Sequence, residues 1–422
     1  MKKITLFISL FAATFTFGQD LSTEFKDIEK KVIELRRHFH QNPELSNREF
    51  KTSDKIAEVL TDLGIEFTRN VAKTGIVGII KGDKPGKVVA LRADIDGLPV
   101  IERNNLPFKS TKKTTFLGKN VGVMHACGHD THIAILLGVA EILSKHKDKI
   151  KGTVKLIFQP AEEGAPKGEE GGAELMVKEG VLKNPDVDAI FGLHINSGTP
   201  VGRINYRKGG IMAASQSFKI DVKGKQSHGS RPWTGIDPIM ISAKIIDGLQ
   251  TIVSREAELT KEAAVITVGK IDAGVRSNII PESASMIGTI RTLDYDMQAY
   301  INKRMKEMVP AIAKAYKAEA TIEIEKGYPI TFNNHKLVDQ MLPTLQRVAG
   351  KDNVKNVNAV TGAEDFSFFA KEIPGFYFFL GGMTPGNKNP FPHHTPDFQI
   401  DESGMLLGVK VMTNIVFDYL NQ

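Results

Sequence analysis

Met124-His-Ala-Cys127-Gly-His129-Asp-Thr-His132 is the stretch that decides the fold and the chemistry of this chain. It holds three imidazoles, a carboxylate and the only cysteine of the sequence. Cys127 and His129 flank a glycine, so an extended backbone or a tight turn could direct both side chains at one point. A thiolate and an imidazole together suit zinc, cobalt or manganese. The apolar run 133–143 predicts a helix that carries this cluster at its N-terminal end. The alternative is a helix start with unrelated histidines.

Length and charge limit the class of protein. A chain of 422 residues exceeds the usual size of one hydrophobic core, which predicts two domains. Its 41% apolar and 25% charged residues are ordinary for a globular protein. The net charge of +6 is spread over the whole length, so we expect no binding to nucleic acid.

The first eighteen residues predict a cleavable signal peptide. Lys2 and Lys3 precede an apolar stretch, residues 4–17, that is too short to span a bilayer, and the small residue Gly18 follows. An uncleaved anchor is the alternative. No cysteine follows that could carry a lipid, so we expect a periplasmic or secreted protein without a membrane partner after cleavage. The lone Cys127 of an exported chain cannot form an internal disulfide, and metal coordination would protect its thiol.

Polar residues follow several predicted strands. Helices are expected near 21–42 and 52–63, and then 76–80 and 88–91 alternate like neighbouring strands around the turn 82–86. The second strand leads into Asp94 and Asp96, at the position where open α/β sheets place chemistry. These acids could bind metal, pair with Arg92 or orient a metal-bound histidine, and orientation is preferred.

Further candidate site residues lie towards the C-terminus. Strand 153–158 leads to Glu162 and Glu163, which are either surface acids or a metal ligand beside a proton acceptor, the pair that metal-assisted hydrolysis requires. Strand 189–193 leads to His194 by the same geometry. A short helix is expected to begin at 364–366, a strand at 376–381, and a closing helix at 406–420. Between the last two, residues 393 and 394 are both histidine.

The middle of the chain has a different pattern. Strands at 217–222, 264–271, 284–291 and 320–325 and helices at 238–253 and 296–316 give the order βαββαβ, which is ferredoxin-like. The polar residues of this region include His228, Asn278 and Arg291. A surface position is the simpler interpretation of His228.

In this order and spacing, the motifs together resemble peptidase family M20, in particular its amidohydrolase branch of auxin-conjugate, hippurate and N-acyl-amino-acid hydrolases. The matching runs cover essentially the whole mature chain, at 36–45, 91–99, 124–130, 158–164, 192–194, 278–281, 364–366 and 394–396. The resemblance implies an α/β fold with a metallo-exopeptidase-like catalytic domain, a mixed sheet flanked by helices, at 19–213 and 328–422. It also implies an inserted lid and dimerisation domain at 214–327. The signal peptide, residues 1–18, precedes the catalytic domain.

The resemblance further implies a role for individual residues. Two divalent ions, manganese or zinc with cobalt or nickel as alternatives, would be held by five ligands: Cys127, His129, Glu163, His194 and His394. Glu162 would be the general base and acid. His228 would polarise the scissile carbonyl, and Asn278 and Arg291 would contact the substrate. His394 is preferred over His393 because the family histidine stands two residues before the proline.

The sequence therefore predicts a metal-dependent hydrolase of linear carbon–nitrogen bonds that cleaves an N-acyl amino acid into a carboxylic acid and a free amino acid. A homodimer through the lid domain is the expected assembly. The alternatives within the enzyme class are a metallo-dipeptidase or carboxypeptidase and an N-acetyl-diaminopimelate deacetylase. The alternative from another class is an inactive, metal-stabilised binding protein, which the retained Glu162-Glu163 pair argues against.

Overall fold

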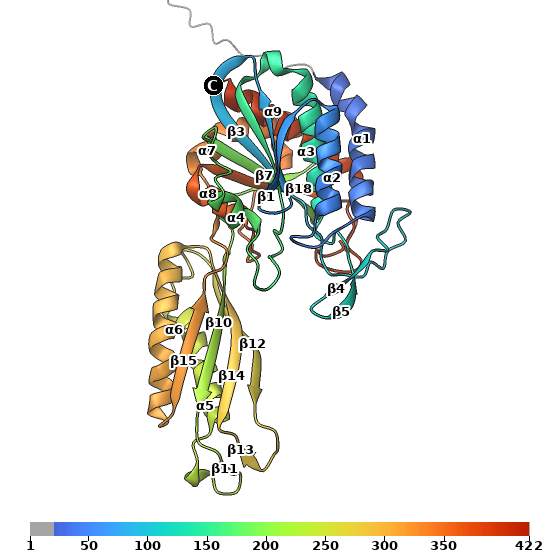
Figure 1. Cartoon of the computed structure of the whole chain (residues 1–422). Helices are drawn as coiled ribbons and strands as arrows, with labels where there is room; N and C mark the ends of the chain where they lie inside the picture. The colour runs from blue at the N-terminus through green and yellow to red at the C-terminus, as the bar shows by residue number, and fades with distance from the viewer. Residues whose placement is uncertain (1–20, 422) are drawn as a thin grey trace, which may run out of the picture.

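The computed structural model describes residues 21–421, and the predicted signal peptide lies outside this range. Figure 1 shows two bodies, a larger one that contains both ends of the described chain and an elongated smaller one beneath it. Among the described residues, no helix combines the length and the apolar character needed to cross a membrane.

The larger body is built on an eight-stranded mixed sheet in the order β1-β2-β6-β3-β7-β18-β8-β17. In its centre, β3 pairs in parallel with β6 and β7, and β7 pairs in parallel with β18. These strands are buried on both faces, as expected of parallel strands between helical layers. The bounds are β1 Glu66–Val71, β2 Gly75–Lys81, β3 Lys84–Asp94, β6 Lys151–Gln159, β7 Ala189–Pro200, β8 Ile204–Tyr206, β17 Val354–Asn356 and β18 Gly375–Met383.

The expectation that the second and third strands of this sheet are neighbours is wrong. β6 lies between them, antiparallel to β2 and parallel to β3. The connection passes over the start of β6 at close range, because a Cβ atom at Gly82 would lie 2.1 Å from the Ile150 carbonyl oxygen. A glycine-containing link between two strands fits a hairpin and a crossing equally well, so the local pattern could not reveal the inserted strand.

Helices cover both faces of the sheet, which confirms the predicted fold class. One face carries α1 Ser22–Gln41, α2 Phe50–Asp62, α3 His129–Lys145, α7 His335–Ala349 and α9 Met405–Leu420, whose apolar sides share one core with the sheet. The other face carries the short helices α4 Gly172–Lys178 and α8 Phe366–Glu372 over a second core. Burial of a helical stripe against a sheet face is the main stabilising contribution in such a layered structure.

The smaller body is a four-stranded antiparallel sheet with two helices. Its strand order is β12-β14-β10-β15, and its elements follow the predicted order βαββαβ. Both helices share with the sheet a core that is separate from those of the larger body. The bounds are β10 Ala214–Lys223, α5 Pro238–Thr251, β12 Ala264–Ala273, β14 Ser283–Thr292, α6 Tyr295–Ala315 and β15 Glu319–Glu325. The role of this body as a lid stays a prediction.

The two bodies are joined where β10 begins and β15 has ended. Ser215 N donates to Tyr328 O at 3.0 Å, so the two connecting segments run side by side, and we call this junction the hinge. The short pair β11 Ser227–His228 and β13 Ile279–Ile280 lies at the opposite end of the smaller body, and we call it the tip (Figure 1). A hairpin of β4 Lys113–Phe116 and β5 Lys119–Gly122, which the sequence did not predict, extends from the larger body.

Candidate metal centre

A left-handed glycine sets the geometry of the central motif. Gly128 has φ +93° and immediately precedes α3, which begins at His129. A Cβ atom at this position would lie 2.3 Å from the Cγ2 atom of Ile195, so both the conformation and the space require glycine. The turn places Cys127 and His129 on either side of the helix start.

All five predicted metal ligands come together at the end of the sheet near this turn. Cys127, His129 and His194 form one group whose potential ligand atoms lie within 4.8 Å of one another, and Cys127, Glu163 and His394 form a second. Cys127 Sγ lies 3.4 Å from His194 Nε2 and 3.3 Å from His394 Nε2. Because the cysteine belongs to both groups, its sulfur stands where it could bridge two ions.

Hydrogen bonds direct one ring nitrogen of His129 and one of His194 towards this centre. His129 Nδ1 lies 3.2 Å from Asp96 Oδ1, whereas its buried Nε2 atom has no hydrogen-bond partner among the described residues. His194 Nδ1 donates to the Ile195 carbonyl oxygen at 2.6 Å, which leaves Nε2 facing the sulfur. A buried nitrogen lone pair without a donor, beside a thiol and a carboxylate, fits a borderline divalent cation.

The two adjacent C-terminal histidines have different environments. His393 Nε2 accepts a hydrogen bond from Ser197 N at 3.2 Å, and its Nδ1 lies 3.2 Å from the Cys127 carbonyl oxygen, to which it donates. Both of its ring nitrogens are therefore engaged. His394 Nε2 lies 3.2 Å from Glu163 Oε1. This arrangement favours His394 as the ligand, as the resemblance implied.

The other two imidazoles of the central motif have different surroundings. Ile195 N donates to His132 Nε2 at 2.8 Å, so Nδ1 carries the proton that His132 donates to Asp94 at 2.5 Å. His132 thus supports β7 beside the centre. Among the described residues, neither buried ring nitrogen of His125 has a hydrogen-bond partner, but His125 belongs to none of the ligand groups, and burial lowers its pKa to about 4. The orienting role preferred for the strand-end acids is found in the contact of Asp96 with His129.

Glu162 and Glu163 occupy distinct places. Glu163 N donates to Asp96 Oδ2 at 3.0 Å, and the Glu163 carboxylate faces His394. Glu162 Oε2 lies 3.9 Å from His129 Nε2, and its carboxylate also groups with those of Glu364 and Asp365. Burial, followed by the charges of Glu364 and Glu163, raises the pKa of Glu162 well above its usual value. Glu162 thus lies beside the ligand groups without belonging to either of the two that share Cys127, which is where a general base and acid would act.

The charges of Glu162 and Glu163 also affect the pKa of the Cys127 thiol. Burial, followed by the charges of Glu163 and Glu162, raises the pKa of Cys127 well above its usual value. A divalent cation would reverse this effect, because it stabilises the thiolate and the carboxylates together. The electrostatics of the centre therefore favour a bound cation.

The three residues expected to contact substrate are not brought together within one chain. His228 is exposed at the tip, where Gly229 N donates to Asn278 O at 2.8 Å. Arg291 lies near the hinge, where β14 pairs it with Ser215 of β10. The structure therefore separates His228 and Asn278, at the tip, from Arg291, at the hinge.

Two contributors to the centre were not assigned a role from the sequence. Tyr328 of the hinge donates from its hydroxyl to the Glu162 carbonyl oxygen at 2.7 Å. Glu364 accepts from the Tyr377 hydroxyl at 2.6 Å and lies beside Glu162. The acid pair before Phe366 was a signal for Glu364, whereas nothing local to residue 328 indicates a contact across the hinge.

Comparison with known proteins agrees with this geometry. The model of peptidase family M20/M25/M40 matches residues 90–418. Thermostable carboxypeptidase 2 of Saccharolobus solfataricus is 43% identical over 406 residues, which cover 96% of this chain and 99% of that protein. N-acetyl-L-cysteine deacetylase of Bacillus subtilis is 36% identical over 399 residues, 93% of this chain and 90% of that protein. A solved Bacillus subtilis structure, described as a dinuclear metal-binding peptidase of the M20 family, superposes with a TM-score of 0.79 at 33% identity, covering 94% of this chain and 99% of that one.

Proposed function

The chain belongs to peptidase family M20, and from this premise we propose that it hydrolyses N-acyl amino acids to a carboxylic acid and a free amino acid. Its wider class is a metal-dependent hydrolase of amide or peptide bonds. The observation that carries the proposal is the geometry of the centre. Two ligand groups share Cys127, and Glu162 stands beside them.

We assign different roles in hydrolysis to the residues of the centre. Cys127, His129, Glu163, His194 and His394 would hold the two divalent ions, manganese or zinc. Bound ions lower the pKa of an attacking water and stabilise the developing oxyanion. Glu162 takes the proton from water and passes it to the departing amine. The sharing of one cysteine by the two groups supports a dinuclear site rather than two independent ones.

The position of His228 supports a dimeric enzyme. β14 runs from the tip to the hinge over ten residues, a length of roughly 30 Å at about 3.4 Å per residue. The metal centre lies beside the hinge, because Tyr328 contacts Glu162. A rigid rotation about a hinge does not change the distance of the tip from that hinge. We therefore propose that His228 acts on the metal centre of a second copy of the chain.

Arg291 would hold the substrate carboxylate. It lies on β14 beside the hinge and thus on the same side of the smaller body as the metal centre. Its guanidinium group offers the fork of donors that a carboxylate accepts. A free carboxylate next to the scissile amide is the feature shared by N-acyl amino acids.

A carboxypeptidase is the second candidate, because the relative from Saccharolobus solfataricus that carries this name is 43% identical to the chain. The same centre would serve both reactions, since each cleaves an amide beside a free carboxylate. Only the group on the acyl side of the scissile bond differs.

Metal removal and substrate comparison test the proposal. We expect the chelated protein to lose activity on hippurate and N-acetyl amino acids and to regain it with about two manganese or zinc ions per chain. These compounds and dipeptides should be assayed side by side at equal concentration. Faster cleavage of dipeptides than of every N-acyl amino acid would contradict the proposed substrate class and favour a peptidase.

A further inference from the structure

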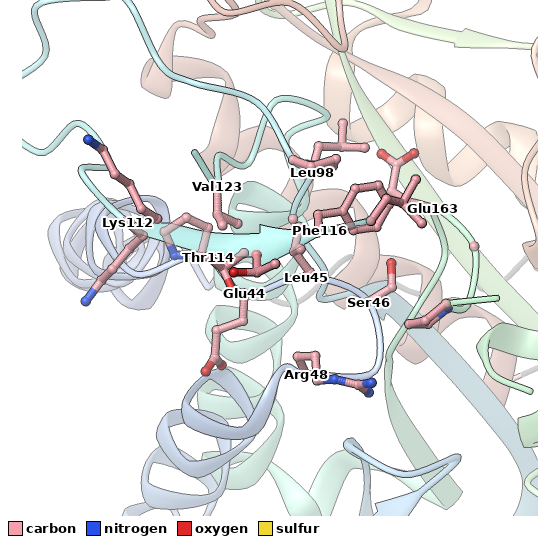
Figure 2. Close-up of a pocket in the computed structure, with 18 of the residues that line it drawn as sticks. Glu44, Leu45, Ser46, Arg48, Leu98, Lys112, Thr114, Phe116, Val123 and Glu163 are labelled. Carbon is pink, nitrogen blue, oxygen red and sulfur yellow. The ribbon is translucent and has the colours of Figure 1, made fainter. Parts of the chain in front are cut away.

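A large pocket opens beside the metal centre on the side of the larger body that carries the β4–β5 hairpin. It has a volume of about 710 Å³, which is within the range of small-molecule sites. Glu163 and Gly164 line it together with the segment between α1 and α2 and the hairpin. Figure 2 shows Glu163 on one side of this pocket and Lys112 on the other. A molecule bound at the metal centre can therefore extend into the pocket from Glu163.

The body of the pocket is apolar. Leu45, Leu98, Val123 and Phe116 line it, and Phe116 comes from the hairpin (Figure 2). Leu117, at the turn of the hairpin, also lines it and keeps 78% of its surface exposed. Apolar side chains gathered around a concave surface indicate a site that a ligand covers.

The rim of the pocket is basic. Its ionisable groups are Glu44, Arg48, Lys51, Lys112, Lys113, Glu163 and Lys167. Glu44 accepts hydrogen bonds from Thr52, and Arg48 pairs with Glu169. Within the described part of the chain, none of the four lysines forms an ion pair. Lys51 interacts electrostatically with Glu44, so Lys112, Lys113 and Lys167 are the lysines that offer uncompensated positive charge to a ligand.

We propose that this pocket binds the acyl half of the substrate, and that the preferred acyl group is an apolar chain ending in a carboxylate. The inference rests on the proposed function and deepens it. The amino-acid half faces the hinge, where Arg291 lies, whereas the pocket is built from other elements beyond Glu163. The apolar body accommodates the methylene chain, and the positive charge of the rim, to which Lys112 and Lys113 contribute, attracts its terminal carboxylate. A neutral acyl group of equal length lacks this attraction.

Matched acyl groups test the pocket. N-hexanedioyl and N-hexanoyl derivatives of one amino acid share the length and differ in the terminal carboxylate, and the N-acetyl derivative is too short to occupy the pocket. We expect the wild-type enzyme to have a kcat/KM roughly tenfold higher for the hexanedioyl than for the hexanoyl compound. The double variant Lys112→Ala/Lys113→Ala should bring this ratio close to one.

A control variant on the same hairpin isolates the effect. Lys119 lies on β5 and does not line the pocket, so Lys119→Ala removes a positive charge and should keep the wild-type ratio. If Lys119→Ala lowers the ratio as much as the double variant does, general charge rather than the pocket is responsible, and the assignment is wrong.

The outcomes separate the pocket from the reaction. Hydrolysis of the N-acetyl compound with equal kcat/KM for the two six-carbon compounds overturns the pocket and leaves the proposed function standing. If no N-acyl amino acid is cleaved, the proposed function fails. Calorimetric binding of the two six-carbon compounds to the metal-loaded protein then tests the pocket assignment by itself. Tighter binding of the hexanedioyl compound then supports the pocket, whereas equal binding or none overturns it.

Discussion

The second ring nitrogen of each histidine decides what that histidine does. His129 directs Nδ1 to Asp96 and His194 directs Nδ1 to a backbone carbonyl, so each presents Nε2 to the metal centre. His132 and His393 have partners on both nitrogens and cannot do so. Ligand assignment within a histidine-rich motif therefore depends on contacts from other strands and loops, not on spacing alone.

The division of roles between the adjacent glutamates gives a prediction at this scale. Glu162→Gln should keep the fold and about two ions per chain but lower kcat by about 10²–10⁴-fold, because the amide cannot accept the proton from water. Metal content by elemental analysis and kcat on an N-acetyl amino acid are the measurements.

Glu163→Gln is the matched comparison. It changes the neighbouring residue in the same way, and we expect it to lose metal as well as activity, because Glu163 faces His394 in the second ligand group. Retention of both ions by Glu163→Gln, together with metal loss in Glu162→Gln, would reverse the two assignments.

At the scale of elements, a buried ionic network docks α1 onto the metal-bearing helix. Arg36 Nε and His40 Nδ1 each lie 2.8 Å from Asp130 Oδ2, in the first turn of α3. His40 Nε2 also lies 3.0 Å from Glu102 Oε1. Buried charges of opposite sign need this mutual pairing, because each alone would carry a large desolvation cost.

The network predicts a pH-dependent stability. Burial lowers the pKa of His40, but its hydrogen bonds to Asp130 and Glu102 outweigh this and raise the pKa above 6.5. The stability that protonated His40 contributes is therefore complete below pH 6.5 and is lost as the pH rises through the raised pKa. Glu102→Gln should lower the free energy of unfolding by about 1–3 kcal/mol at pH 6 and by less at pH 9.

Urea unfolding of the metal-loaded protein, followed by circular dichroism, measures this difference. Burial raises the pKa of Glu102, but the hydrogen bond and charge of His40 and the hydrogen bond from Ser110 N together lower it, so Glu102 stays ionised throughout this pH range. Glu66→Gln alters an exposed acid paired with Lys81 and should show little change at either pH. A difference for Glu102→Gln that is constant from pH 6 to pH 9 would show that His40 does not titrate there.

At the scale of the whole molecule, the position of the hinge limits what one chain can do. The metal centre lies beside the hinge and His228 lies at the far tip (Figure 1). The smaller body also has a core of its own, so it can keep its shape while its orientation changes. The molecule is thus divided into a part that holds the centre and an arm that extends away from it.

Mixing two inactive variants tests whether this arm serves a second chain. In a mixed dimer of Glu162→Gln and His228→Ala, one centre has an intact Glu162 and receives an intact His228 from the other chain. After random subunit exchange, we expect about a quarter of the wild-type activity, because half of the dimers are mixed and each has one complete centre.

The control replaces the second variant with the double variant Glu162→Gln/His228→Ala, which leaves no intact Glu162 and should give no activity. Light scattering establishes whether the protein is dimeric. Activity of the first mixture that does not exceed that of its unmixed components would show that His228 acts within its own chain or not at all.

The motifs of the sequence predicted the family, the fold class and the five residues that the structure brings into two ligand groups. They did so because glycine, cysteine, histidine and acids at strand ends have few other reasons to occur in that order. The sequence also predicted the βαββαβ order of the smaller body, because the periodicity of apolar residues that indicates each strand or helix is a local property.

Tertiary structure alone decided the rest. It placed β6 between β2 and β3, made His132 a support rather than a ligand, formed the lysine-rimmed pocket and set His228 far from its expected place of action. Each of these depends on contacts between segments distant in the chain. Residue types and local periodicity are properties of the sequence itself, whereas strand pairing, tautomer and distance exist only once the chain has folded.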